Sequence, residues 1–236
     1  MADEADVALY DSLTDQVALV TGATRGIGAA IAAQLADLGA TVYAGARETD
    51  DITAPDQHPV ELDVTERAHA REAAARIESE AGRLDILVNN AGIFRRADTL
   101  HDMDVDTLDE TVAVNLRGPI LVTQQFVPLL REREGGRVVN LSSNLGQFTH
   151  GTGGSYPAYR VTKAGLGAFT AYLDAEYGDD GLLANAASPG WVRTDMGGPG
   201  APRSPSEGAE TPVWLARFRP GSPGGLFWRD KSVIDW

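Results

Sequence analysis

Hydrophobic and polar positions along the chain alternate between two periods, one typical of buried strands and one of amphipathic helices. Residues 17–20 form a continuous apolar run, as in a strand that is covered on both faces. Residues 27–38 then carry apolar side chains three or four positions apart, which predicts a helix with one buried face. The same alternation recurs along the chain, so the pattern predicts a parallel sheet with helices on both of its faces.

The predicted elements fill a single domain, residues 1–236, with residues 1–15 as a loosely held polar arm. Later strands are expected at residues 40–46, 60–62, 84–88, 136–141, 183–187 and 225–228. Later helices are expected at residues 65–81 (with Thr65 as a cap), 104–130 (interrupted near Gly118 and Pro119), 157–177 and 206–217. We therefore expect an α/β fold with a doubly wound parallel sheet of about seven strands.

The turn between the first strand and the first helix, residues 21–28, reads TGATRGIG. Gly22 would permit the tight turn, Gly26 would let a phosphate approach the backbone, and Gly28 would let the helix pack closely on the strand. A helix N-terminus presents free N–H groups and a positive dipole end to such a phosphate. Strand, glycine turn and helix together predict a Rossmann-type dinucleotide site, although the spacing G-x-x-x-G-x-G differs from the usual fingerprint, and an ordinary βα turn is the alternative.

A second motif, Tyr159 and Lys163, places a phenol and an ammonium one helical turn apart on the same face. The ammonium is expected to lower the tyrosine pKa from about 10, so that the pair exchanges a proton with an alcohol or carbonyl oxygen. Ser142 and Ser143 precede the motif at the ligand crevice of the predicted sheet. One serine hydroxyl would stabilise charge on the substrate oxygen, and only one should face the site because adjacent strand residues point to opposite sides.

Composition removes several classes of function. The net charge of −14 argues against a nucleic acid or an acidic membrane as partner. The absence of cysteine excludes disulfides and thiolate chemistry. No apolar run approaches the roughly 20 residues that span a bilayer, and no signal-peptide pattern is present, so a cytoplasmic protein is expected. The acidic, lysine-poor composition fits either a salt-adapted protein or an arginine-rich genome.

The histidines offer no metal site. Their positions, with no metal-ligand spacing, are His58, His69, His101 and His150. His150 lies near the predicted site, where it either contacts the substrate or is a plain loop residue. Hydride chemistry at a tyrosine and a serine needs no metal, and we expect none.

Taken together, the motifs resemble the short-chain dehydrogenase/reductase family along almost the whole chain. They occur in the family's order: TGATRGIG, Asp63–Val64, NNAG at residues 89–92, Asn115, Ser143, Tyr159, Lys163 and Pro189–Gly190. The resemblance implies that Tyr159 is the general acid/base and Ser143 the oxyanion partner. It also implies that Lys163 binds the nicotinamide ribose and tunes Tyr159, and that Asn115 holds a water.

The resemblance likewise implies a set of cofactor contacts. Asp63 and Val64 would contact adenine, residues 89–92 would support the adenosine side, and Thr194 would meet the carboxamide. The full set is Gly22, Thr24, Arg25, Gly26, Ile27, Gly28, Arg47, Asp63, Val64, Asn89, Ala91, Gly92, Tyr159, Lys163, Pro189, Gly190, Val192 and Thr194. Ala46 stands where an NAD enzyme typically has an acidic residue, and Arg25 and Arg47 suit a 2′-phosphate, so NADP(H) is expected.

Residues 188–216 and 231–236 resemble the carbonyl reductases of this family in particular. The resemblance implies reversible, NADPH-dependent reduction of a small ketone or aldehyde, in a pocket lined by Phe94, residues 145–149, Tyr156 and residues 191–202. The alternatives are a non-catalytic NADP-binding regulatory or structural protein, and a 3-oxoacyl-carrier-protein-type reductase. A reductase of this last type would need a basic surface patch to bind its acidic carrier protein.

Oligomerisation is expected because monomeric carbonyl reductases carry a long helical insertion before the catalytic tyrosine. Here only 16 positions separate Ser143 from Tyr159, so that insertion is missing. Small residues at helical spacing, Ala164, Ala168, Ala171 and Ala175, would let two copies of the helix approach closely across a twofold axis. We expect a tetramer or a dimer; the alternative is that these alanines pack against the protein's own sheet.

Overall fold

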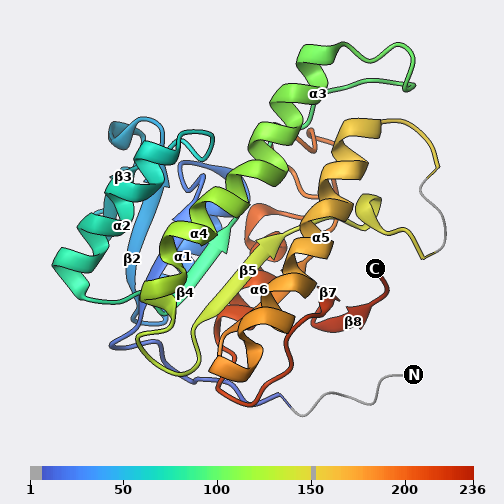
Figure 1. Cartoon of the computed structure of the whole chain (residues 1–236). Coiled ribbons are helices and arrows are strands. Elements are labelled where there is room, and N and C mark those ends of the chain that lie inside the picture. Colours follow the sequence, from blue (N-terminus) through green and yellow to red (C-terminus); the bar gives the residue numbers. More distant parts are fainter. Residues whose placement is uncertain (1–6, 150–152) are drawn as a thin grey trace.

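A mostly parallel sheet runs through the molecule in the computed structural model, which describes residues 7–149 and 153–236 (Figure 1). Within this part of the chain, eight strands pair in the order β3-β2-β1-β4-β5-β6-β7-β8. Their bounds are β1 Val17–Thr21, β2 Thr41–Ala46, β3 Gln57–Glu61, β4 Ile86–Asn89, β5 Arg137–Leu141, β6 Leu183–Ala187, β7 Phe227–Arg229 and β8 Ser232–Ile234. Neighbouring strands are parallel except β8, which is antiparallel to β7.

Helices cover both faces of the sheet, as predicted (Figure 1). They are α1 Gly26–Asp37, α2 Arg67–Ala81, α3 Val105–Val112, α4 Gly118–Leu130, α5 Pro157–Tyr177 and α6 Pro205–Ala216, with a π-helical turn η2 at Ala113–Arg117 and a short 3-10 turn η3 at Asn144–Gly146. Ala18 and Val20 of β1 pack with α1 and α6, whereas Val17 and Leu19 pack with α2 and α4, because alternate strand side chains face opposite sides. No helix in the described part of the chain is long and apolar enough to cross a membrane.

The strand order reverses direction between β1 and β4. In a sheet of this kind, ligands bind beside such a reversal, at the carboxyl ends of the strands. The chain runs from β1 outwards to β3, then returns to β4 on the other side of β1 and continues to β7. The carboxyl ends of these parallel strands therefore lie along one edge of the sheet. That edge carries Thr21, Asn89 and Leu141 as the last residues of β1, β4 and β5.

Several predicted boundaries are wrong for local reasons. The sequence pattern missed β8 because the hairpin turns through Asp230 and Lys231, both with positive φ, rather than through an Asn-Gly pair. Thr65 does not cap α2; its hydroxyl instead donates to the Asp63 carboxylate at 2.7 Å. The interruption expected near Gly118 and Pro119 is present, as the π-helical turn that ends directly before α4, and Pro119 stands in the first turn of α4, where proline is favoured.

The prediction of a loosely held arm is wrong for residues 7–15. Leu13 is fully buried in the core, and Leu9 forms a β-bridge with Phe218. The Tyr10 ring lies 5.4 Å from the guanidinium carbons of both Arg137 and Arg219. This segment is therefore fixed to the end of the sheet that lies opposite the crevice. Residues 1–6 are outside the described part of the chain.

Candidate active site

The glycine turn between β1 and α1 has the backbone conformation that its sequence predicts. Gly22 and Gly26 have φ values of +65° and +60°, which an L side chain disfavours. A Cβ on Gly28 would lie only 2.2 Å from the carbonyl oxygen of Gly22, so glycine is required for α1 to pack against the turn. The turn at Gly22 and the close packing at Gly28 therefore agree with the roles expected of these two glycines, while the approach of a phosphate at Gly26 stays a prediction.

The same turn is tied to the end of β4. Thr21 Oγ1 accepts hydrogen bonds from the backbone N–H groups of Asn90 and Ala91, each at 3.0 Å. The Asn90 amide donates to the carbonyl oxygens of Thr21 and Gly22, at 2.9 and 3.1 Å. These bonds hold the ends of the two central strands together as one rigid floor for the crevice.

The N-terminus of α1 leaves its first N–H groups free of side-chain caps. Arg25 is the cap residue but makes no capping hydrogen bond, and the first turn carries no acidic side chain. Arg25 is paired instead with Asp195 at 2.9 Å. Thr194 lies against the turn, since a Cβ on Gly26 would be 3.1 Å from its methyl group. Uncapped N–H groups at a helix N-terminus suit a phosphate group.

Ser143, Tyr159 and Lys163 come together where β5 ends beside α5. Tyr159 as a residue is 8% exposed, and its phenol is hydrogen-bonded to the Ser143 side chain. Lys163 is buried; its Nζ lies 5.7 Å from the centre of the Tyr159 ring and donates to the Leu141 carbonyl oxygen at 2.6 Å. The structure thus brings the serine, the tyrosine and the lysine of the two motifs into one cluster.

The two adjacent serines differ in their contacts. Ser142 Oγ donates to the carbonyl oxygen of Lys163 at 3.1 Å, which fixes β5 to α5. Ser143 Oγ accepts the N–H of Leu145 at 3.2 Å and contacts Tyr159. Only Ser143 therefore faces the crevice, in agreement with the alternation of side chains along a strand.

Burial controls the pKa values in this cluster. It raises the pKa of Tyr159 to about 12, despite the opposing hydrogen bond from Ser143. It also lowers the pKa of Lys163 to about 8. The pKa of Tyr159 is thus raised and not lowered as expected, because the effect of burial is the largest one on this phenol. Tyr159 is therefore protonated at neutral pH and able to donate a proton.

Asn115 lies in the π-helical turn and is completely buried. Its Oδ1 accepts the backbone N–H of Ile93, and its Nδ2 donates to the Ile93 carbonyl oxygen, both at 2.8 Å. A Cβ on Gly92 would lie 3.4 Å from Asn115 Oδ1 and 3.8 Å from Lys163 Nζ. Asn115 and Lys163 therefore flank one small space beside Gly92, and π-turns of this kind are frequent at functional sites.

Arg47 and Asp63 lie close together beyond the ends of β2 and β3. The pKa of Asp63 lies below its ordinary value. Burial by itself would raise this pKa, but the hydrogen bonds from Thr65 and the charge of Arg47 together outweigh that effect. The Arg47 side chain is exposed, while Ala46 before it is buried. Val64 is buried against α4, since a Cβ on Gly118 would lie 2.9 Å from its methyl group. An exposed guanidinium therefore stands beside the expected adenosine site.

Some predicted contacts have packing roles in the structure. Asn89 points into the interior, where it donates to Thr123 Oγ1 and Asn140 Oδ1 at 3.0 and 2.8 Å. This side chain supports the strand ends and does not reach the crevice. Val192 is buried, and a Cβ on Gly208 of α6 would lie 2.7 Å from Val192 and 3.5 Å from Ile27. These two apolar side chains fix the loop after β6 to α1 and α6.

The remaining predicted residues lie along the rim. Pro189 and Gly190 follow β6, and the Pro189 carbonyl oxygen accepts Arg203 Nη1 at 3.2 Å. Thr24 is half-buried within the glycine turn. The Phe94 ring packs against Tyr156 and Tyr159, with centroid distances of 4.7 and 5.0 Å, and forms an aromatic wall beside the phenol. His150 lies outside the described residues.

Two residues that the sequence reasoning missed hold the loop after Ser143. Arg160 donates to the carbonyl oxygens of Ser155 and Leu145, at 2.8 and 3.2 Å. Trp236 accepts the N–H groups of Phe148 and Thr149 on its main-chain oxygen, at 3.1 and 2.8 Å. Arg160 directly follows Tyr159, so its position in the motif could have indicated a contact near the site. The contacts of Trp236 could not have been predicted, because its partners are distant in the sequence.

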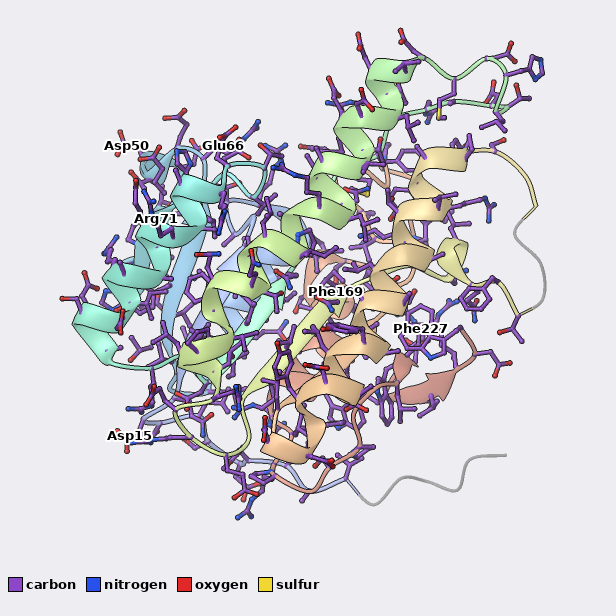
Figure 2. All side chains as sticks on the ribbon, viewed as in Figure 1. Asp15, Asp50, Glu66, Arg71, Phe169 and Phe227 are labelled. Carbon is purple, nitrogen blue, oxygen red and sulfur yellow. The ribbon has the colours of Figure 1, made fainter. Side chains whose placement is uncertain are left out.

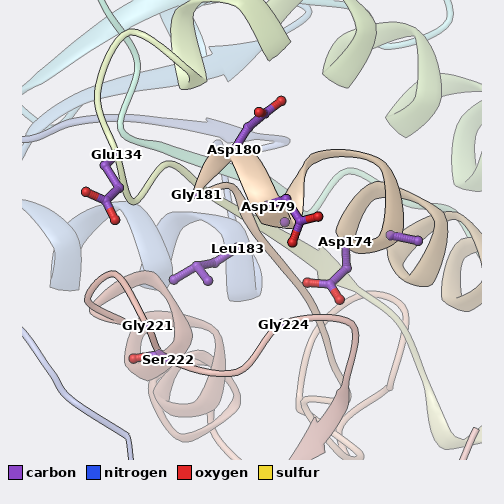
Figure 3. A pocket seen from close by; sticks show the side chains of 11 residues that line it. Glu134, Asp174, Asp179, Asp180, Gly181, Leu183, Gly221, Ser222 and Gly224 are labelled. Carbon is purple, nitrogen blue, oxygen red and sulfur yellow. The ribbon is translucent and has the colours of Figure 1, made fainter.

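A separate surface pocket of about 560 Å³ lies at the other edge of the sheet (Figure 3). Asp174, Asp179 and Asp180 are among its lining residues, together with Leu183, which begins β6. The Ser143 cluster lies at the carboxyl ends of the strands, so this acidic pocket is not part of the candidate active site.

The family model for short chain dehydrogenases matches residues 16–203. The chain therefore belongs to the short chain dehydrogenase family.

Individual relatives include proteins named as reductases. Carbonyl reductase [NADPH] 1 of Bos taurus is 34% identical over 280 aligned positions, which cover 95% of this chain and all of the relative. The alignment is longer than the 236 residues of this chain, so the relative holds segments that this chain lacks. The 3-oxoacyl-[acyl-carrier-protein] reductase of Aquifex aeolicus is 39% identical over 78% of this chain and 77% of the relative.

Solved structures show the same fold over nearly the whole chain. The NADPH-bound carbonyl reductase from chicken fatty liver superposes with a TM-score of 0.83 at 27% identity, covering 94% of this chain and 99% of that chain. A short chain dehydrogenase from Burkholderia cenocepacia in complex with NADP gives a TM-score of 0.81 at 30% identity, covering 94% and 97%.

Proposed function

We propose that this chain is an NADP(H)-dependent oxidoreductase that reduces a ketone or an aldehyde to an alcohol, in a reversible reaction. The observation that carries the proposal is the cluster of Ser143, Tyr159 and Lys163, which lies at the same carboxyl edge of the sheet as the glycine turn. Similarity to carbonyl reductases named for NADPH supports the choice of cofactor and reaction.

The crevice fits a dinucleotide on its own geometry. Gly22, Gly26 and Gly28 form a turn that side chains would fill, and the first N–H groups of α1 are uncapped. Ala46 stands where an NAD enzyme typically has an acid, and Arg47 directly after it supplies an exposed guanidinium, which favours a 2′-phosphate. When bound there, the nicotinamide would supply the hydride or accept it.

The side chains would manage the proton and the charge on the reacting oxygen. Tyr159 is a buried, protonated phenol, so it can donate its proton to a carbonyl oxygen as negative charge develops there. Ser143 hydrogen-bonds the phenol and would stabilise the same oxygen. Lys163 places a positive charge beneath the phenol and would steady the phenolate left after transfer. Asn115 keeps the segment after β4 in place beside Lys163.

Reduction of a carrier-bound 3-oxoacyl group is the second candidate. The similarity to the Aquifex aeolicus enzyme favours it. The net charge of −14 opposes it, because an acidic carrier protein would be repelled. A non-catalytic NADP-binding protein is the third reading, and the intact proton-donating cluster opposes it.

The decisive experiment is to follow NADPH oxidation with a panel of ketones and aldehydes, for the wild type and Tyr159→Phe. We expect the phenylalanine variant to lose about 100-fold or more in turnover, the usual size of general acid–base catalysis, with NADPH affinity nearly unchanged. Near-normal turnover would remove Tyr159 from the mechanism and direct attention to Tyr156. Wild-type protein that binds NADPH but reduces no carbonyl compound would support the non-catalytic reading.

A further inference from the structure

Residues 144–149 form a substrate-side loop that begins directly after Ser143. The backbone of Gly146 packs on α5 so closely that a Cβ there would lie 2.7 Å from the Lys163 carbonyl carbon. Leu145 donates its N–H to Ser143 Oγ at 3.2 Å. A shift of this loop would therefore move the hydrogen bond that orients the Ser143 hydroxyl group.

The residues after β8 hold the far end of this loop. The main-chain oxygen of Trp236 accepts the N–H groups of Phe148 and Thr149, at 3.1 and 2.8 Å. The Gln147 side-chain amide donates to the Asp235 carbonyl oxygen at 2.7 Å. Three consecutive loop residues are thus bonded to two consecutive residues of a segment about 87 positions further along the chain.

The Trp236 ring is seated in a notch on α5. A Cβ on Gly167 would lie 2.7 Å from ring atoms Cε3 and Cζ3, so the indole covers the helix where a side chain is missing. Gly167 follows Tyr159 and Lys163 at intervals of four residues, on the same helix face. The indole also stacks on Phe227 of β7, with centroids 5.2 Å apart and planes at 12°. Figure 2 labels Phe227 beside α5 at the edge of the sheet.

We propose that Trp236 is a positioning residue for the reaction. Its ring, fixed between Gly167 and Phe227, holds its main-chain oxygen in place, and this oxygen keeps the loop 144–149 seated so that Ser143 stays beside Tyr159. The proposal deepens the proposed reductase function and rests on it. It gives β8 and the two residues after it a part in catalysis without contact to the reacting atoms.

The test compares Trp236→Ala, Trp236→Phe and Gly167→Ala in the full chain, with Val233→Ala as the matched control. Val233 is an exposed residue of β8. We expect Trp236→Ala to lower kcat/KM for the carbonyl substrate about tenfold or more, since small misplacements of catalytic groups are costly. NADPH affinity should change less than twofold. Trp236→Phe should recover part of the loss, and Val233→Ala should match the wild type.

Gly167→Ala provides a second, independent way to displace the indole. Its methyl group would occupy the notch, so activity should fall as in Trp236→Ala although alanine favours a helix. In the double variant, Gly167→Ala should cause no further loss, because no ring remains to be displaced. Additive losses in the double variant, or wild-type kcat/KM in Trp236→Ala, would overturn the proposal.

Amide hydrogen exchange separates this proposal from the proposed function. The Leu145, Phe148 and Thr149 amides should exchange at least tenfold faster in Trp236→Ala than in the wild type. If the wild type reduces no carbonyl compound, the proposed function fails and exchange alone decides the role of Trp236. Unchanged protection of these amides would then overturn the positioning role.

Discussion

Ser142 and Ser143 are identical in chemistry and adjacent in sequence, yet their side chains have different contacts. Ser142 donates to the Lys163 carbonyl oxygen, while Ser143 contacts the Tyr159 phenol. Which of the two faces the crevice follows from the pleat at the end of β5. The pair therefore offers a matched comparison at the scale of single residues.

Ser143→Ala should lower turnover about 100-fold, the usual effect of removing one donor to a developing oxyanion. Ser142→Ala should keep turnover within about twofold and lose about 1 kcal/mol of stability with its hydrogen bond. Steady-state kinetics and urea unfolding of both variants provide the measurement. Equal losses of turnover would contradict the assignment of Ser143.

Lys163 links the site to the pH dependence of stability. Its pKa is about 8 in the folded chain, whereas an unfolded lysine holds its proton to about pH 10.4. Between these values the folded state binds fewer protons, so this group stabilises the fold increasingly as pH rises. From pH 7.5 to 9.5 the free energy of unfolding of the wild type should gain about 2 kcal/mol relative to Lys163→Met. Urea unfolding at both values tests this, and parallel pH dependences would contradict it.

At the scale of elements, the parallel sheet gathers distant segments at one edge. The glycine turn follows β1, Arg47 follows β2 and Asp63 follows β3, so three consecutive strand ends surround the proposed adenosine site. Arg25 is engaged with Asp195, whereas Arg47 is exposed beside Asp63. The end of β2 is therefore where we expect the choice between NADPH and NADH to be made.

Arg47→Ala should weaken NADPH binding about 10- to 100-fold, the equivalent of roughly 1.5–3 kcal/mol for one charge-assisted contact, and leave NADH binding nearly unchanged. Titration of both cofactors by fluorescence tests this. Arg71→Ala is the matched control, because Arg71 is an exposed arginine on α2 that pairs with Glu72 of the same helix (Figure 2). Equal losses for both cofactors would show that Arg47 does not read the 2′-phosphate.

At the scale of the whole molecule, α5 exposes an apolar stripe. Val161 and Tyr172 are 64% and 56% exposed, and Ala168 and Ala175 lie exposed on the same side of the helix. Ala171 is exposed as well, whereas Ala164 is half-buried, so three of the four alanines at helical spacing do not pack against the protein's own sheet. We therefore propose that the outer face of α5 joins two copies of the chain in a dimer or a tetramer.

Light scattering in dilute and in molar salt should give a multiple of 25.0 kDa for the wild type. Ala168→Arg should give the monomer mass, because a long side chain prevents close approach, and Ala68→Arg on exposed α2 should not. Acidic chains repel one another more at low salt, so a monomer only in dilute salt would favour the salt-adapted interpretation. A 25.0 kDa species in both conditions at micromolar protein would contradict the proposal.

The sequence by itself determined the local features of this protein. Residues 157–177 were expected as a helix and form α5 with the same bounds, because the apolar period and the leading proline act within one segment. The glycine turn and the pairing of Tyr159 with Lys163 were predictable for the same reason. Each depends on residues a few positions apart.

Only the tertiary structure decided the contacts between distant segments. It placed Trp236 against Gly167, Tyr10 between Arg137 and Arg219, and the Asn89 amide in the interior. It also reversed the expected pKa shift of Tyr159, because burial depends on every element packed around the phenol. Periodicity and motif spacing carry no information about such partners, since they describe how one segment is built and not which segment it meets.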